Sequence, residues 1–159
     1  MKRAVLQSSI VTLLSGFLFL SQPATAQKVQ VSPVPQQEKW STEVAFNRPV
    51  SVNIKAPKNI DKDALKALTN TFPKGKDGVK VILGKRGDKS VKAFESKIPN
   101  QAESYYLSVT PESVTIAGND DTGLYYGVKS FLQIASQPQV MQVEISDWPS
   151  IPLRGVIEG

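Results

Sequence analysis

The chain has 159 residues and a net charge of +5 at pH 7, from 19 Lys and Arg against 14 Asp and Glu. It contains no histidine and no cysteine, which excludes imidazole-based catalysis and metal ligation, cysteine nucleophiles and disulfide bonds. The basic residues are scattered rather than gathered between aromatic residues, and no Gly-rich phosphate loop is present, so we expect neither a nucleic-acid partner nor a cofactor.

The first 26 residues predict a signal peptide rather than part of a fold. Two positive charges near the start are followed by an apolar run at 10–20 and by the small residues Ala24-Thr25-Ala26. A membrane-spanning helix needs ~20 apolar residues, so this run is too short to be a good anchor. We expect cleavage before Gln27, export to the periplasm or the exterior, and no membrane span in the mature chain.

Alternating apolar residues predict three strands at the start of the mature chain, over 28–40, 43–47 and 50–56. Pro33 and Pro35 lie in the first of these segments. Because proline cannot donate a hydrogen bond to a neighbouring strand, that segment is expected at an edge of a sheet or at the entry to it.

A change to helical periodicity follows. Asp61 is the expected N-cap of a helix that Pro73 ends, and its apolar face is formed by Ala64, Leu65, Leu68 and Phe72. The segment Val79–Gly84 predicts a short interior strand. The polar residues 85–101 predict a loop.

The second half predicts a hairpin, a helix and a strand. The hairpin strands are Tyr105–Val109 and Ser113–Ala117, and the last strand covers 140–146. Between them, Asn119, Asp120 or Asp121 is the expected cap of a helix with one wide apolar face, formed by Leu124, Val128, Phe131, Leu132 and Ala135. The order of elements predicts an α+β domain over 27–150, a mixed β-sheet with two helices packed against it.

Two glycines four residues apart interrupt the second helix. Glycine lowers helix propensity, so Gly123 and Gly127 need a reason to be there. We expect that a neighbouring strand approaches the helix closely at these positions.

Three features have both a functional and a structural interpretation. Arg86-Gly87-Asp88 matches an integrin-binding tripeptide, but Gly-Asp most simply forms a turn. The adjacent carboxylates Asp120 and Asp121 can act as an acid and a base, yet their place before a helix favours capping. Glu158 lies in an apolar segment, where a carboxylate is either buried with a partner or faces a site; the sequence leaves these two alternatives open.

The segment "SYYLSVTPESVTIAGNDDTGLYYGVKSFLQI", followed by "VEISDWPSIPLRGVIEG", resembles bacterial glycoside hydrolase family 84. These hexosaminidases remove O-linked N-acetylglucosamine, and they include enzymes called hyaluronoglucosaminidases. The resemblance implies a small zincin-like domain without a metal site, which is shared with family 20 hexosaminidases. It also implies a (β/α)8 catalytic barrel that follows, whose first strand opens with the motif present here as Arg154–Gly159.

The resemblance implies that the parent protein is a β-N-acetylglucosaminidase with a substrate-assisted retaining mechanism. Residues 151–159 then correspond to a truncated first barrel strand, in which Gly159 contacts the sugar through its main chain. The family's catalytic aspartate pair lies on a later barrel strand that this chain lacks. We therefore expect no catalytic residue and no activity in this chain alone; the domain would pack on its own barrel, and the barrel would bind N-acetylglucosamine-containing glycans.

The alternative is a stand-alone secreted module that binds carbohydrate or protein without hydrolysing it. Such a module needs a surface row of aromatic residues, and the clustered candidates are Tyr105, Tyr106, Tyr125 and Tyr126. Because each pair is adjacent along a strand or helix, we expect at least one member of each to point inward.

Overall fold

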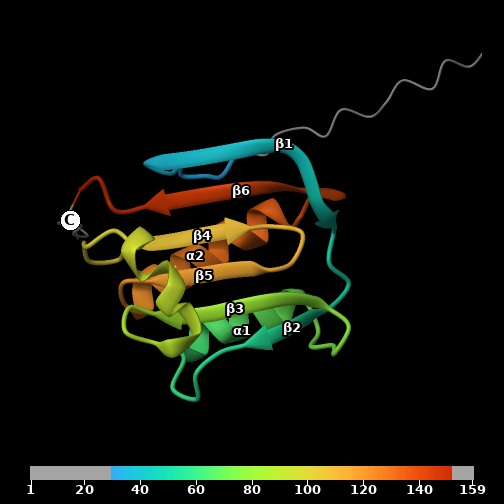
Figure 1. Ribbon diagram of the computed structural model, residues 1–159, viewed down its shortest axis with the longest axis horizontal. Coiled ribbons are helices and arrows are strands. Elements are labelled where there is room, and N and C mark those ends of the chain that lie inside the picture. The colour runs from blue at the N-terminus through green and yellow to red at the C-terminus, as the bar shows by residue number, and fades with distance from the viewer. Residues whose placement is uncertain (1–29, 152–159) are drawn as a thin grey trace, which may run out of the picture.

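The computed structural model describes residues 30–151, which form one mixed sheet with helices on both faces (Figure 1). The elements in chain order are β1 (Gln37–Asn47), β2 (Val52–Lys55), α1 (Lys62–Thr71), β3 (Val79–Lys85), the 3-10 helix η1 (Lys89–Lys97), β4 (Tyr105–Val109), β5 (Val114–Gly118), α2 (Asp121–Ile134) and β6 (Gln139–Asp147). The sheet order is β1-β6-β4-β5-β3-β2. β2, β3 and β5 run parallel, whereas β4 is antiparallel to β5 and β6, and β1 is antiparallel to β6.

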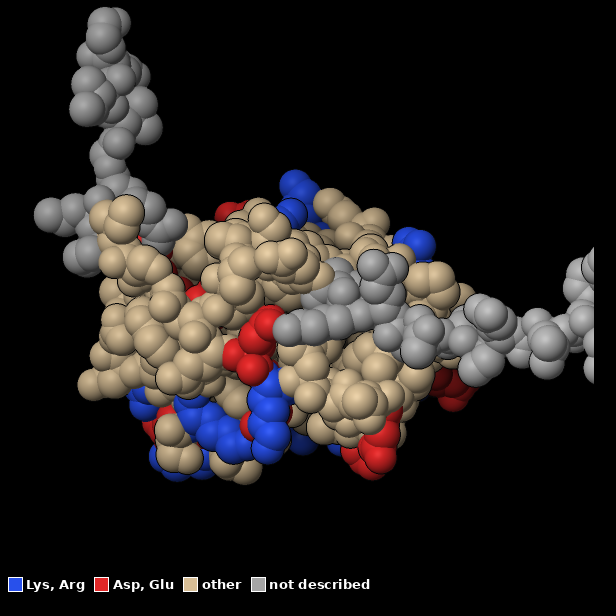
Figure 2. Space-filling model, turned by 90° about the horizontal axis from the view of Figure 1, so that it is seen from above, with Lys and Arg blue, Asp and Glu red and all other residues tan. Residues whose placement is uncertain are grey.

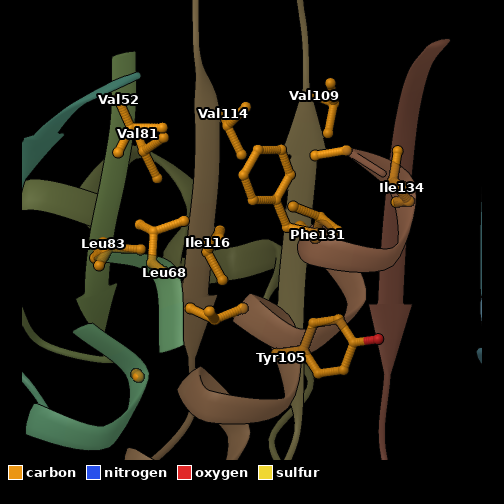
Figure 3. Packing of buried hydrophobic residues seen from close by; sticks show 14 of the residues in the cluster. Val52, Leu68, Val81, Leu83, Tyr105, Val109, Val114, Ile116, Phe131 and Ile134 are labelled. Atoms are coloured by element: carbon orange, nitrogen blue, oxygen red, sulfur yellow. The ribbon is translucent and has the colours of Figure 1, made fainter. Parts of the chain in front are cut away.

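The main core lies between the sheet and the two α-helices, which cover the same face of the sheet (Figure 1). Phe131 of α2 points toward the strands that carry Val109 and Val114 (Figure 3). Leu68 brings α1 into the same core beside Leu83 of β3. The predicted fold class, a mixed sheet with two helices packed against it, is therefore confirmed.

Helix α1 begins and ends as its sequence predicts. The Asp61 side chain accepts a hydrogen bond from the Ala64 amide at 2.6 Å, which satisfies a backbone donor that the first turn leaves open. Pro73 follows the helix at its end. Along its length, Ala64 and Leu68 are buried while the polar residues face solvent.

The glycines of α2 lie where the helix meets β4 and β5. A Cβ on Gly123 would lie 2.0 Å from the Ser104 carbonyl oxygen, and a Cβ on Gly127 would lie 2.7 Å from a methyl carbon of Ile116. Both distances are too short for real carbon atoms. The expected close approach of a strand is confirmed at Gly127, which meets Ile116 of β5, whereas Gly123 meets Ser104, the residue just before β4. These contacts explain why two glycines are retained inside a helix.

Two strands expected near the N-terminus are a single strand in the structure. Residues 30–36 form no strand, which agrees with the lack of backbone donors at Pro33 and Pro35. β1 instead runs through 41–42 to Asn47. Trp40 pairs with Val143 and Val44 pairs with Met141, so four steps along β1 match two steps along β6. Such bulges interrupt the alternation of buried and exposed residues from which a strand is predicted.

β1 is an edge strand that pairs with β6 alone. Figure 2 looks onto this edge and shows acidic and basic side chains within a larger uncharged surface. The opposite edge is the four-residue strand β2. Both edges therefore differ from a long, flat and apolar strand.

The segment expected to be a loop, 85–101, contains η1, which covers the other face of the sheet (Figure 1). Val91 and Ile98 are buried there against Tyr106 and Ala117, and the ring of Phe94 stacks on Tyr106 with centroids 5.9 Å apart. This second, smaller core explains why β4 and β5 are buried at every position.

The predicted signal peptide at 1–26 lies outside the described residues, as does the predicted strand at 151–159 except for Ile151, which is 65% exposed. In the part of the chain that the structure describes, no helix has the length and apolar character needed to cross a membrane.

Candidate functional site

The adjacent carboxylates Asp120 and Asp121 serve the structure. One Asp120 oxygen accepts from the Gly123 amide at 2.8 Å and the other from the Glu103 amide at 2.7 Å. Asp121 lies 2.7 Å from Lys85 Nζ, and this hydrogen bond raises the pKa of Lys85. The two carboxylates thus have separate partners. The capping interpretation is confirmed for Asp120, which is the N-cap of α2, whereas Asp121 is the first residue of the helix and pairs with Lys85.

The tripeptide Arg86-Gly87-Asp88 forms the turn that the sequence favours. Arg86 donates to the Asn119 side chain at 2.7 Å and to the Ile98 carbonyl at 2.6 Å, so its guanidinium is engaged within the fold. Asp88 accepts from the Lys85 amide at 2.7 Å. Gly87 has φ of +90°, which favours glycine.

The four clustered tyrosines do not form an exposed row. Tyr105 and Tyr106 are each 2% exposed and belong to the cores on opposite faces of the sheet. Tyr125 and Tyr126 are half-buried and pack against the main core. The expectation that at least one member of each pair points inward is confirmed, and the aromatic surface that a glycan-binding module would need is not built from these residues.

A groove of about 410 Å³ lies beside α2, and we call it the α2 groove. Its walls come from three segments: residues 32–34 with Gln36, one side of α2 between Tyr126 and Gln133, and residues 147–151. Tyr105 and Ser130, both buried, line it at the point where the Tyr105 hydroxyl lies 2.7 Å from Ser130 Oγ. Burial raises the pKa of Tyr105, more than the Ser130 hydrogen bond lowers it, so this phenol stays neutral.

The walls of the α2 groove are fixed by side-chain hydrogen bonds between distant parts of the chain. The Gln133 amide group accepts from the Ser32 backbone N–H at 2.8 Å and donates to the Ser32 carbonyl at 2.9 Å. The Gln36 backbone N–H donates to Asp147 Oδ1 at 3.0 Å, and the Gln36 side chain donates to Ser150. These contacts hold both ends of 32–36 against α2 and against the end of β6.

A second polar cluster lies on the η1 face of the sheet. Lys97 Nζ is 2.8 Å from a Glu144 carboxylate oxygen and 3.1 Å from the Tyr106 hydroxyl, which itself donates to Glu144 at 2.9 Å. The hydrogen bond from Lys97 lowers the pKa of Glu144, whereas Glu144 raises the pKa of Lys97 and burial raises the pKa of Tyr106. Each group satisfies the others, and the arrangement is that of a structural ion pair.

Sequence reasoning missed both the α2 groove and this cluster, because their members come from segments up to about 110 residues apart. The available signal was the alternation that places Tyr106 and Ser108 on one face of a strand. It does not reveal which strand lies alongside.

Two predicted candidates, Glu158 and the sugar-contacting Gly159, lie outside the described residues. Within 30–151, no group of three His, Cys, Asp or Glu side chains is placed to hold a metal ion.

Comparison with known proteins gives two curated relatives of particular interest. α-Glucuronidase A of Emericella nidulans is 26% identical over 173 aligned residues, which cover 92% of this chain and 19% of that protein. β-Hexosaminidase of Vibrio vulnificus is 34% identical over 113 residues, which cover 67% of this chain and 13% of that protein. The chain thus spans less than a fifth of the length of these relatives.

Solved structures share the fold. The chain named CpGH84D matches with a TM-score of 0.68 at 18% identity, over 84% of this chain and 26% of that one. The family 20 exo-β-N-acetylglucosaminidase of Vibrio harveyi, in complex with N-acetylglucosamine, matches with a TM-score of 0.55 at 17% identity, over 81% of this chain and 20% of that one. At such identities the likeness shows the fold.

The model of a known family matches residues 28–148, which is most of the chain, and its description is "Glycosyl hydrolase family 20, domain 2". The resemblance drawn from the sequence, to a small domain shared with family 20 hexosaminidases, is thereby confirmed. The chain therefore belongs to the domain family described as glycosyl hydrolase family 20, domain 2.

Proposed function

We propose that this chain is the non-catalytic N-terminal domain of an exported β-N-acetylglucosaminidase, and that it packs against the catalytic barrel that performs the hydrolysis. The observation that carries the proposal is the family 20 domain 2 match over residues 28–148, together with relatives that are more than five times longer than the matched segment. On this proposal, the catalytic residues of the parent protein belong to the barrel and not to this domain.

The non-catalytic role is supported by how the adjacent carboxylates Asp120 and Asp121 are used. Asp120 has both oxygens engaged by backbone amides, and Asp121 is paired with Lys85. Neither arrangement leaves a pair of carboxylates facing a common substrate position, which glycoside hydrolysis by two carboxylates requires.

A hexosaminidase is favoured over an α-glucuronidase by two observations. The β-hexosaminidase relative has the higher identity, 34% against 26%. The sequence Arg154–Gly159 also resembles the opening of a family 84 barrel, in which the glycine contacts the sugar. On this proposal the substrate class is glycans with a terminal N-acetylglucosamine, cleaved with participation of the substrate's own acetamido group.

The test compares the 159-residue chain with the full reading frame of its gene. The full-length protein should hydrolyse a chromogenic N-acetylglucosaminide, and the 159-residue chain should not. A chromogenic glucuronide is the control substrate and should remain intact. Hydrolysis of the N-acetylglucosaminide by the 159-residue chain would contradict the non-catalytic role. If the full-length protein cleaved only the glucuronide, the proposed substrate class would be wrong.

A separate measurement tests export. Fractionation of cells that express the full-length protein should place it in the periplasm or the medium, with an N-terminus at Gln27. A cytoplasmic protein that begins at Met1 would contradict this part of the proposal.

A further inference from the structure

The fold gathers lysines that are scattered along the sequence. Residues 53–92 carry eleven Lys and Arg against four Asp and Glu, whereas residues 93–151 carry two against seven. This basic segment includes β2 and β3, the two strands at the end of the sheet that lies opposite β1 (Figure 1). The positive charge of the domain is therefore concentrated at one end of the sheet.

Two hollows lie side by side at this end of the sheet. The first, of about 470 Å³, lies between β2, the start of α1 and the loop at 74–76. The second, of about 440 Å³, lies between the end of β2 and the turn that precedes η1. Ala56 and Pro57 line both, so the hollows adjoin. Five exposed lysines line them, and we call these residues the lysine surface: Lys55, Lys58, Lys74, Lys76 and Lys89.

No ion pair within residues 30–151 involves the lysine surface. The ion pairs of this region belong to other lysines, which are Lys85, Lys92 and Lys97. Of the residues that line the two hollows, Asp88 alone carries a carboxylate, and its Oδ2 accepts from the Lys85 backbone N–H at 2.7 Å. Like charges gathered in a hollow reinforce one another's potential, so this surface attracts an anion.

Protection of the sheet edge explains only a part of the lysine surface. Lysine side chains on an edge strand deter another strand from pairing, and Lys55 of β2 can serve in this way. The other four lie outside the strands. Lys58 follows β2, Lys74 and Lys76 precede β3, and Lys89 begins η1. These four positions indicate a contact with an anionic partner that extends beyond the strand itself.

The residues around the lysines narrow the class of this partner. No aromatic residue lines either hollow, whereas proteins bind single-stranded nucleic acids by stacking the bases on aromatic side chains. None of the large hydrophobic side chains that are exposed within residues 30–151 lines the hollows, so none is placed there to enter a lipid bilayer. A water-soluble polymer that bears carboxylate or sulfate groups fits both observations.

We propose that the lysine surface binds an acidic polysaccharide, a glycan chain whose carboxylate or sulfate groups pair with the lysines across both hollows. Binding through charge does not require the aromatic row that the four clustered tyrosines fail to form. An exported protein meets such polymers outside the cytoplasm, so the proposed export agrees with this partner. The inference goes beyond the proposed function, because it assigns glycan binding to this domain itself and needs no catalytic barrel.

Isothermal titration of the 159-residue chain with acidic polymers tests the proposal. Polygalacturonate presents carboxylates, dextran sulfate presents sulfates, and neutral dextran is the control. Binding to either acidic polymer, but not to dextran, supports the proposal and identifies the acidic group. The affinity should fall at least about tenfold when sodium chloride is raised from about 0.05 M to about 0.5 M, because salt screens exposed charges. Absence of binding to both acidic polymers, or equal binding to neutral dextran, would overturn the proposal.

Two charge-matched triple variants locate the binding. The test variant removes three charges from the lysine surface by Lys58→Gln, Lys74→Gln and Lys76→Gln. The control variant removes three exposed charges outside both hollows by Lys39→Gln, Arg48→Gln and Lys129→Gln. Loss of three exposed ion pairs should weaken binding by about tenfold in the test variant, against less than about threefold in the control. Equal losses would mean that net charge alone drives binding and would contradict the lysine surface.

A charge-conserving variant separates binding from folding. Arginine at positions 58, 74 and 76 keeps the three charges, so this variant should retain the affinity of the wild-type chain to within about threefold. All three variants should unfold at the wild-type temperature, because every substituted side chain is exposed. If the arginine variant loses binding while it unfolds normally, charge pairing is not the mechanism and the proposal fails.

Other anions give the remaining outcomes. Tighter binding to duplex DNA, or to phosphatidylglycerol vesicles, than to either acidic polysaccharide would assign the surface to another class of partner and overturn the proposal. The result is independent of the proposed function, since hydrolysis of the N-acetylglucosaminide is measured on the full-length protein. Polysaccharide binding without hydrolysis would contradict the proposed function alone, and hydrolysis without polysaccharide binding would contradict this inference alone.

Discussion

The hydroxyl of Tyr105 lies 2.7 Å from Ser130 Oγ, and this contact joins β4 to α2 across the interior of the domain. Both residues are buried, and both line the α2 groove. The bond therefore couples the sheet to the helix at the base of the α2 groove. Burial raises the pKa of Tyr105, so its hydroxyl stays protonated at pH 10, where a free tyrosine ionises.

A double-mutant cycle should measure this coupling. We expect Tyr105→Phe and Ser130→Ala each to lower the free energy of unfolding by about 1 kcal/mol, and the double variant to lose less than the sum of the two, with a coupling of about 1 kcal/mol. Urea denaturation of the four proteins gives the values. Additive losses would mean that the hydrogen bond makes no contribution to stability.

Gly123→Ala should destabilise the domain by about 1–3 kcal/mol, because the added Cβ would lie 2.0 Å from the Ser104 carbonyl oxygen and would overpack the contact. In an unconstrained helix the same substitution stabilises by up to about 1 kcal/mol, so the sign of the effect is diagnostic. Thr122→Ala, at the exposed neighbouring position, is the control and should change stability by no more than about 0.5 kcal/mol. A stabilising Gly123→Ala would disprove the close approach.

The two adjacent aspartates should respond differently to alanine. Asp120→Ala removes the N-cap of α2 and the acceptor of the Glu103 amide, and we expect a loss of about 1–2 kcal/mol. Asp121→Ala removes a pair with Lys85 in which the aspartate side chain is 57% exposed, so solvent screening should keep the loss below about 1 kcal/mol. Thermal unfolding of the two variants tests the order. Equal losses would contradict separate roles.

A matched test addresses catalysis by Asp120. Asp120→Asn keeps an acceptor for the Gly123 amide but loses the acceptor for the Glu103 amide, so it should retain the N-cap and part of the stability. In the full-length protein it should retain turnover of the N-acetylglucosaminide. A large loss of turnover in a folded Asp120→Asn variant would restore the acid–base interpretation of this pair.

The Glu144–Lys97 pair predicts an acid-dependent loss of stability. The folded-state pKa of Glu144 is lowered below 4.5, mainly by Lys97, so its stabilising contribution is fully present above that pH and is lost as pH falls through the folded-state value. The raised pKa of Lys97 sets the opposite limit, since that contribution is present below pH 10.5 and is lost as pH rises through its folded-state value.

Melting temperatures of the wild-type chain and of Glu144→Gln between pH 3 and pH 7 check this prediction. The difference between them should be present at pH 7 and should shrink below about pH 4.5. Both side chains of the pair are 47% exposed, so the effect should be below about 1 kcal/mol. A difference that grows toward low pH would contradict the assigned sign.

Much of the fold follows from local patterns. Asp61 and Pro73 mark the ends of α1. The alternation of apolar residues predicts the hairpin that begins at Tyr105, and Leu124 and Phe131 define the buried face of α2. These signals are local because capping, turn formation and helix amphipathicity involve neighbours within one or two turns.

The remaining features depend on partners distant in sequence. Val91, Phe94 and Ile98 lie in a Lys-rich segment, and they form a core only because Tyr106 and Ala117 lie beneath them. The bulges of β1 are likewise set by its pairing with β6. The α2 groove could not be predicted for the same reason, since Gln36 and Asp147 are 111 residues apart in the sequence and lie together because β1 pairs with β6.

The irregular register of β1 bears on how the domain behaves at high concentration. A regular edge strand offers an unbroken row of backbone donors and acceptors to which another chain can add, and fibrous aggregates grow in this way. In β1 the bulges between Trp40 and Phe46 interrupt that row, and Glu38, Lys39 and Glu43 place charges along it. The longest exposed edge of the domain is thereby a poor template for sheet extension between molecules.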